Sequence, residues 1–258
     1  MCKNQKIMIH SFVTDGYIQF AEIFLHSLQH LYGNKIYVRI DSCDLSKKNR
    51  NKLKDIHNNL DIFHTELDIN YLTSELNIKQ HTLYFWNKEI EANRTTSKNF
   101  WYKIYISVDK RYRMLDEIIQ YAKDQNYSYL LHLDIDNYLR TQFIENLISV
   151  VKDYDIGIFI NNSEEHTKKY WGGFICFNLT GNIDDFIYNW MHEIDKYDLK
   201  NRWKDFGQSA LNFAIDKTEN LKVANLSKLK HSPVRSNEFN INADLWPCSN
   251  SRRRYLPQ

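Results

Sequence analysis

The sequence predicts one α/β domain built around a mostly parallel sheet. Short apolar runs that suit buried strands alternate with amphipathic stretches that suit helices throughout the first half of the chain. Strands that alternate with helices in this way form right-handed crossovers between parallel neighbours. The 258 residues are 43% hydrophobic, which is ample for one core, and no linker, repeat or low-complexity tract divides them.

The first half gives the clearest strand and helix signals. Gly33-Asn34 is a typical end for the first helix, because glycine and asparagine tolerate the backbone conformation of a helix C-cap. Residues 65–100 are polar and hard to assign, so we interpret them as a long excursion. In chain order the predicted elements are a strand Lys6–Val13, a turn Thr14-Asp15-Gly16, a helix Ile18–Tyr32, a strand Ile36–Ile40, a helix Lys47–Asn58, a strand Leu60–His64, a helix Met114–Ala122 and a strand Tyr129–Leu133.

The second half predicts a less regular arrangement. Thr141 is expected to cap a helix whose inner face holds Ile144, Leu147, Ile148 and Val151. Two strands are then expected on either side of a polar loop, followed by a long helix and a short one. These elements are a strand Ile156–Asn161, a loop Ser163–Gly172, a strand Gly173–Phe177, a helix Ile183–Tyr197, a helix Gln208–Ile215, a strand Leu221–Leu226 and an irregular tail.

Composition excludes several classes of protein. The 34 Lys+Arg nearly balance the 32 Asp+Glu, which is untypical of a nucleic-acid coat or an acidic disordered tail. The four cysteines are scattered without a CxxC pair, so neither a zinc ribbon nor a redox dithiol is predicted, and a reducing compartment is favoured. His10 and Ser11 interrupt the first apolar run, so we expect no signal peptide or membrane span and a cytoplasmic location.

The strongest chemical signal is a pair of aspartates, Asp134 and Asp136, directly after the predicted strand Tyr129–Leu133. Residues i and i+2 of an extended chain point to the same side. Open α/β sheets bind ligands at the carboxyl ends of their strands. Two close carboxylates repel each other, and a hard cation such as Mg²⁺ or Mn²⁺ relieves that repulsion. The pattern therefore favours a metal site over a pair of aspartates that only cap a helix.

Other proteins that use such aspartates fit less well. Phosphatases of the haloacid-dehalogenase type carry the motif after their first strand, whereas here it lies past residue 130. An EF-hand loop counted from Asp134 would need a glycine where Leu139 stands. Phosphate-binding loops need glycine-rich turns, and the turn after the first strand contains only Gly16.

In the order of its motifs, the chain resembles the GT-A nucleotide-diphospho-sugar transferases from Ile7 to about Asp216. Gly207 departs from the family pattern, in which an aspartate is frequent before the glutamine. The motifs that carry the resemblance are the nucleotide-binding start Ile7–Tyr17, the D-x-D strand Leu131–Asp136, the small-residue strand Gly172–Asn178 and the helix start Gly207-Gln208-Ser209-Ala210-Leu211-Asn212.

The resemblance implies a metal-dependent glycosyltransferase whose expected donor is a UDP-sugar. Residues 1–137 would form the nucleotide-sugar-binding half of a single domain, and residues 138–258 a mixed, acceptor-binding half with a basic tail. Asp136 would bind Mn²⁺ or Mg²⁺ directly, with Asp134 in support and His231 as a third ligand. The implied donor-binding residues are Phe12, Val13, Thr14, Asp15, Tyr17, Asp41, Asp134 and either Arg111 or Lys103.

On the acceptor side, the resemblance implies contacts from Trp171, Gly172, Gly173 and Gln208 with a glycan or glycoconjugate hydroxyl. Because Gly207 cannot supply a carboxylate, Asp205 is the expected general base. The tail from residue 221 carries a net charge of +5, which suits a diphosphate, a polyanionic acceptor or peripheral membrane contact. The open alternatives are a non-catalytic sugar-nucleotide-binding protein of the same fold and an enzyme that glycosylates nucleic acid bases.

Overall fold

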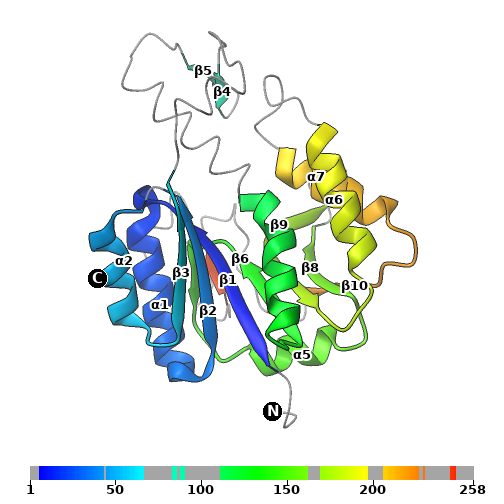
Figure 1. The fold of residues 1–258 in the computed structure, drawn as a ribbon. Helices are drawn as coiled ribbons and strands as arrows, with labels where there is room; N and C mark the ends of the chain where they lie inside the picture. Colours follow the sequence, from blue (N-terminus) through cyan, green and yellow to red (C-terminus); the bar gives the residue numbers. More distant parts are fainter. Residues whose placement is uncertain are drawn as a thin grey trace.

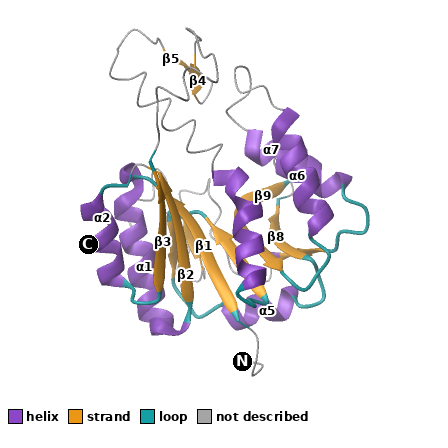
Figure 2. Ribbon diagram, in the orientation of Figure 1, coloured by secondary structure: helices purple, strands orange, loops and turns teal. Residues whose placement is uncertain are grey.

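The computed structural model describes residues 6–43, 45–66, 83–85, 88–90, 111–161, 169–196, 206–226, 229 and 245–247. In these parts of the chain, helices cover both faces of a seven-stranded sheet (Figures 1 and 2). The strand order is β10-β8-β9-β6-β1-β2-β3. Within this sheet, β1, β2, β3 and β6 pair in parallel, as do β8 and β10, and β9 runs antiparallel to both β6 and β8. A separate antiparallel pair is formed by β4 and β5. The prediction of a mostly parallel sheet with a mixed second half is confirmed.

The predicted strands and helices of both halves are present, with shifted ends. The strands are β1 Ile7–Val13, β2 Tyr37–Cys43, β3 Leu60–Thr65, β4 Leu83–Phe85, β5 Lys88–Ile90, β6 Tyr129–Leu133, β7 Asn137–Leu139, β8 Ile156–Ile160, β9 Tyr170–Asn178, β10 Val223–Asn225 and β11 Leu245–Pro247. The helices are α1 Ile18–Tyr32, α2 Lys47–Ile56, α5 Ile144–Val151, α6 Asp184–Lys196, α7 Phe206–Lys217 and a helix over residues 111–124, with short 3₁₀ turns at Asp15–Tyr17 and Gly33–Lys35.

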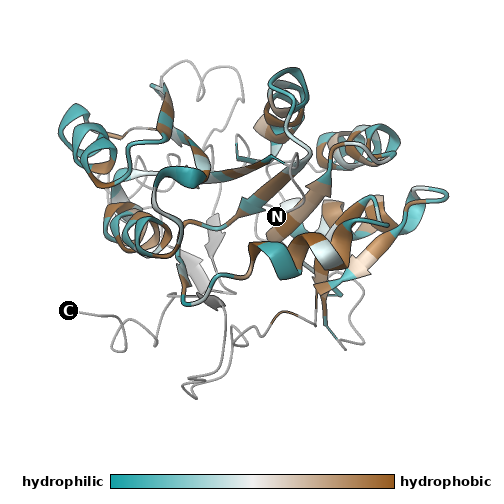
Figure 3. Cartoon of the chain, turned by 90° about the horizontal axis from the view of Figure 1, so that it is seen from below, coloured by the Kyte–Doolittle hydropathy of each residue, from teal (hydrophilic) through white to brown (hydrophobic). Residues whose placement is uncertain are grey.

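Alternation along the strands divides the core into two halves. On one face, α1, α2 and α5 pack against side chains such as Ile9, Val38 and Leu131. On the other face, the helix of residues 111–124 packs with α6 and α7 against side chains such as Met8 and Leu130. Figure 3 shows the result, with hydrophobic colour on the strands and hydrophilic colour on the outer sides of the helices. Both faces of the sheet are therefore buried, which explains the nearly continuous apolar runs of β1 and β6.

Three details differ from the sequence-based expectation. Thr141 is not the cap of α5, because the N-cap is Phe143 and its side chain makes no capping bond. Instead, the hydroxyl of Tyr32 from α1 accepts hydrogen bonds from the backbone N–H groups of Phe143 and Ile144 at 2.7 and 3.2 Å. Nothing in the sequence around Tyr32 predicted this contact, because its partners lie more than 100 residues away.

The second difference is that β9 begins at Tyr170, inside the stretch expected to be a loop. A register shift between Ile158 and Phe159 of β8 allows this longer strand to stay paired. The third is a small antiparallel pair, β7 with β11, where the sequence analysis assigned no element to residues 137–139 and predicted an irregular tail. Within the described residues, no helix is both long enough and apolar enough to span a bilayer.

Candidate functional site

The two aspartates lie on a tight turn at the carboxyl end of β6. The backbone N–H of Asp134 donates to the carbonyl of Gly173 at 2.9 Å, which extends the pairing of β6 with β9 by one residue. The side chain of Asn137 donates to the carbonyl of Asp134 at 2.7 Å and fixes the turn. Ile135 between the aspartates is buried, whereas Asp134 and Asp136 are each partly exposed. The motif therefore presents two carboxylates on a rigid turn at the edge where ligands of α/β sheets bind.

Arg111 brings a positive charge to this turn. Its guanidinium donates to Oδ1 of Asp134, and the two side chains are 23% and 27% exposed. Burial alone would lower the pKa of Arg111, but the carboxylates of Asp134 and Asp136 outweigh burial and raise it. Arg111 is thus permanently charged beside the aspartate turn, and its role as a basic group of a donor site stays a prediction.

Gly173 and Trp171 of β9 form the wall beside Asp134. A Cβ atom on Gly173 would stand 2.7 Å from Oδ2 of Asp134 and 2.7 Å from the indole ring of Trp171. The indole also packs against Phe159, with ring centroids 5.8 Å apart. Glycine at position 173 therefore lets the carboxylate and the indole lie over bare backbone. The structure brings one predicted acceptor-side residue, Gly173, directly against Asp134, the first aspartate of the predicted metal-binding pair.

Gln208 and Asn212, one turn apart on α7, hydrogen-bond that helix to the start of β9. The amide oxygen of Gln208 accepts from the backbone N–H of Gly172 at 2.9 Å, and its amide nitrogen donates to the carbonyl of Tyr170. Asn212 is fully buried, accepts from the N–H of Tyr170 at 2.9 Å and donates to the carbonyl of Gln208 at 2.8 Å. Both amide groups therefore hold the strand that carries the wall. Contact of Gln208 with an acceptor stays a prediction.

The departure at position 207 has a packing explanation. The ring of Tyr112, on the helix of residues 111–124, lies against the Cα of Gly207 and leaves no room for a side chain. A carboxylate at position 207 is thus excluded by the close approach of two helices. The expected base Asp205 lies outside the described residues, as do Lys103 and His231. Their predicted roles remain predictions.

The loop after β1 lies at the same edge of the sheet. Val13 is buried, Phe12 and Thr14 are half-buried, and Tyr17 is 49% exposed. The side chain of Asp15 is held in place, since its Oδ1 accepts from the backbone N–H of Ser46 at 3.1 Å and from Nδ2 of Asn49 at 2.9 Å. Asp15 therefore ties the exit of β1 to the start of α2. The predicted contacts of these residues with a base or ribose stay predictions.

Asp41 belongs to a buried polar row that the sequence did not predict. His132, His10 and Arg39 are register partners on β6, β1 and β2, and all three are buried. Arg39 donates to both oxygens of Asp41, at 2.7 and 3.1 Å, and its guanidinium stacks 4.0 Å from the ring centre of Phe63. Because Asp41 is buried with both oxygens engaged, its predicted contact with a base would require this pair to open. The sequence feature that could have revealed this row is the presence of His10 and His132 in otherwise apolar strands.

Burial favours the neutral form of both histidines, and their contacts favour one arrangement of the ring protons. Burial lowers the pKa of His10 despite the opposing effect of Asp41, and burial lowers the pKa of His132 well below its ordinary value. Nε2 of His10 lies 3.1 Å from Oδ2 of Asp41, a contact outside ideal hydrogen-bond alignment that still favours a proton on Nε2. Nδ1 of His10 must then accept from Nδ1 of His132, 2.8 Å away. Nε2 of His132 is left as a buried acceptor without a partner in the described part of the chain.

Solved structures share this architecture. A crystal structure of an active-site mutant of LgtC superposes with a TM-score of 0.56 and 13% identity, covering 92% of this chain and 85% of that one. The glycosyltransferase GlyE of Streptococcus pneumoniae TIGR4 superposes with a TM-score of 0.52 and 12% identity, covering 88% of this chain and 46% of that one. The chain has the GT-A fold. At these identities the likeness establishes the fold alone.

No family model and no curated protein sequence matches the chain. The aspartates after β6 lie at the carboxyl edge of the parallel strands, the edge at which open α/β sheets bind ligands. The described residues contain no group of three or more metal-ligating side chains. Asp134 and Asp136 are the two carboxylates that this turn presents, and Oδ1 of Asp134 is engaged by Arg111.

Proposed function

We propose that the chain is a glycosyltransferase that moves a sugar from a nucleotide-sugar donor, expected to be a UDP-sugar, to a hydroxyl of a glycan or glycoconjugate. The observation that carries the proposal is the turn after β6, where Asp134 and Asp136 share one edge of a GT-A fold with the guanidinium of Arg111. This arrangement supplies both the anionic ligands of a cation and a fixed positive charge for a diphosphate.

The aspartates fit a hard divalent cation. Carboxylate oxygens suit Mn²⁺ or Mg²⁺, and two protein ligands leave coordination positions for phosphate oxygens and water. Because Gly173 has no side chain, nothing at that position displaces the carboxylate of Asp134. Asp134 and Asp136 would hold the ion, which when bound offsets negative charge on the departing nucleoside diphosphate.

The protein's own groups would orient the reactants. Arg111 is held by Asp134 through one nitrogen, and a guanidinium has five N–H groups, so donors remain for phosphate oxygens. Trp171 and Gly173 would offer a flat apolar wall to the C–H face of a sugar. Asp205 would accept the proton of the acceptor hydroxyl if the reaction inverts the anomeric centre. Cytoplasmic location and membrane contact through the tail remain predictions.

A thermal-shift screen of nucleoside diphosphates tests the proposal. A ligand that binds only the folded state stabilises it, by about 2.7 kcal/mol at a hundred times its dissociation constant. We expect UDP with Mn²⁺ to raise the melting temperature more than ADP or a dinucleotide does, and chelator to abolish the shift. A preference for GDP would change the donor, whereas no response to any nucleotide would contradict the proposal. Binding without transfer would indicate a non-catalytic sugar-nucleotide-binding protein.

A further inference from the structure

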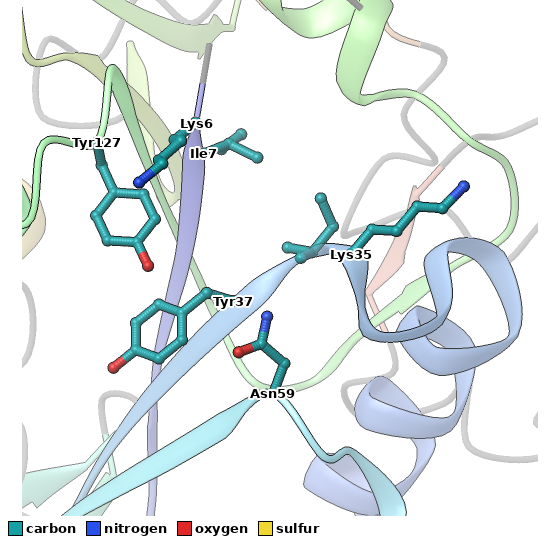
Figure 4. A pocket seen from close by; sticks show the side chains of 7 residues that line it. Lys6, Ile7, Lys35, Tyr37, Asn59 and Tyr127 are labelled. Carbon is teal, nitrogen blue, oxygen red and sulfur yellow. The ribbon is translucent and has the colours of Figure 1, made fainter. Parts of the chain in front are cut away.

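A pocket lies at the amino-terminal edge of the sheet, opposite the aspartate turn (Figure 4). Its volume is about 250 Å³, and its walls come from the starts of β1 and β2 and from the segments that precede β3 and β6. The side chains used below are Lys6, Lys35, Tyr37, Asn59 and Tyr127. Strand β1 runs from this pocket to the loop of the proposed donor site, which at ~3.3 Å per residue places the two sites about 20 Å apart.

Two tyrosines form a rigid aromatic wall on one side of this pocket. The rings of Tyr37 and Tyr127 stack with centroids 5.6 Å apart and planes 19° from parallel. The hydroxyl of Tyr37 donates to Asp61 at 2.9 Å and lies 3.1 Å from the hydroxyl of Tyr121. Because these contacts hold Tyr37 in place, the wall is organised before any ligand binds. Rings of this kind attract C–H groups to their faces.

The rest of the pocket is polar and positively charged. Lys6 lies on the Tyr127 side and Lys35 on the opposite side, with Asn59 projecting between Tyr37 and Lys35 (Figure 4). Neither lysine forms an ion pair with a residue that the structure describes, and no carboxylate lines the pocket. Nδ2 of Asn59 donates to the carbonyl of Asn34 at 3.2 Å, which fixes the amide. Lys6 beside the aromatic wall and Lys35 at the opposite rim, neither paired with a described carboxylate, favour an anion that also has a C–H or flat face.

We infer that this pocket binds one anionic sugar unit, such as a uronic acid or a phosphorylated sugar. Its volume lies below the roughly 300–1,000 Å³ of sites for drug-sized ligands, so a single ring is the appropriate size. Lys6, beside Tyr127, binds the anionic group, and Lys35 adds positive charge at the opposite rim of the pocket (Figure 4). The tyrosines bind the C–H face, and Asn59 hydrogen-bonds a hydroxyl. The sugar is either a unit of a charged acceptor chain or a free sugar phosphate.

Ligand-observed NMR titration of the full chain tests this inference with four probes: glucuronate, glucose 6-phosphate, glucose and inorganic phosphate. We expect both anionic sugars to bind at least tenfold more tightly than glucose or phosphate alone. A double variant Lys6→Gln/Lys35→Gln should lose at least tenfold in affinity for the anionic sugars, and Tyr127→Leu should also weaken them. An oligosaccharide of uronic acid that binds more tightly than glucuronate would identify a chain as the source, and preference for glucose 6-phosphate a free sugar phosphate.

The matched control is Lys152→Gln/Lys222→Gln, which removes the same charge from exposed positions next to β8 and β10 at the other side of the sheet. This control should bind the probes like the unmodified chain. Equal losses in both double variants, or equal binding of glucose and glucuronate, would overturn the inference. Probe binding should be unchanged in Asp136→Ala, so failure of the proposed transfer reaction and failure of this pocket are separate results.

Discussion

The Cα of Gly173 lies directly against the carboxylate of Asp134, and a methyl group at position 173 would stand 2.7 Å from Oδ2. Because real Cβ contacts of that length do not occur, Gly173→Ala must displace Asp134 or the nearby indole ring. A displacement of about 1 Å in a catalytic site can cost on the order of 10²-fold in rate. We therefore expect sugar transfer by Gly173→Ala to fall by roughly 10- to 100-fold in initial-rate assays.

The control for this variant is Gly181→Ala, where a Cβ would be equally close, 2.7 Å, to Oδ1 of Asp155. Asp155 is remote from the aspartate turn and holds backbone N–H groups of Asn182 and Lys222. Gly181→Ala should therefore lower stability but leave the transfer rate per folded molecule unchanged. Equal rates for the two variants would show that Gly173 has no particular relation to the site.

The hydrogen bonds between α7 and the start of β9 give a prediction about stability. Asn212→Leu removes a side chain that is fully buried and satisfies the backbone N–H of Tyr170 and the carbonyl of Gln208. Buried groups left without partners cost about 1–3 kcal/mol each. We expect urea unfolding to show a loss of about 2–4 kcal/mol. Asn189→Leu, which loses one hydrogen bond to Thr218, should cost no more than about 1.5 kcal/mol; a similar loss in both variants would contradict this assignment.

The buried histidines predict that stability falls in mild acid. Burial lowers the pKa of His132, His10 and His57 in the folded chain, whereas unfolded histidine titrates near pH ~6.5. Below about pH 6.5 the unfolded state therefore binds protons that the folded state does not, and the free energy of unfolding falls by up to about 1.4 kcal/mol per pH unit for each such histidine. The lowered pKa of Asp41 contributes only at lower pH, where that carboxylate begins to protonate in the unfolded chain.

Urea unfolding at pH 7.5, 6.5 and 5.5 measures this slope. His132→Gln should flatten it, because one of the buried titrating groups is gone. The exposed His30 serves as the control, and His30→Gln should leave the slope unchanged. A wild-type stability that is constant across this range would show that the histidines titrate normally in the folded chain.

Asp205→Asn tests the general base. Loss of a helix cap costs about 1 kcal/mol of stability, whereas loss of a base costs about 10²–10⁴ in rate. We expect the variant to fold and to bind nucleotide-sugar donor, measured by calorimetry, while transfer slows by at least 10²-fold. Near-normal turnover would leave Asp205 as a cap and the base unassigned.

The sequence predicted most of the fold because both faces of the sheet are buried. Apolar runs such as Tyr129–Leu133 and a regular helical period are local signals, and the two aspartates stand out because they end such a run. The signals failed where an element depends on a distant partner. The first residues of β9, which looked like a loop, are held by amides of α7 some 40 residues away.

The same reason explains what was missed in the candidate site. His10, Arg39 and His132 meet only when three strands align, and no local pattern gives that register. Gly207 was seen as a departure from a motif, but its cause, the ring of Tyr112, lies on another helix. Arg111 and Lys103 were equivalent in the sequence; the structure shows the contact of Arg111 with Asp134, and Lys103 lies outside the described residues.

The most direct test of the central claim is the release of nucleoside diphosphate from UDP-sugars, measured with and without Mn²⁺ for the unmodified chain and for Asp136→Ala. The account predicts release that requires the metal, stops in excess chelator and is lost in Asp136→Ala, while circular dichroism and melting show that the variant still folds. Undiminished release in chelator or by Asp136→Ala, or no release from any nucleotide sugar, would contradict it.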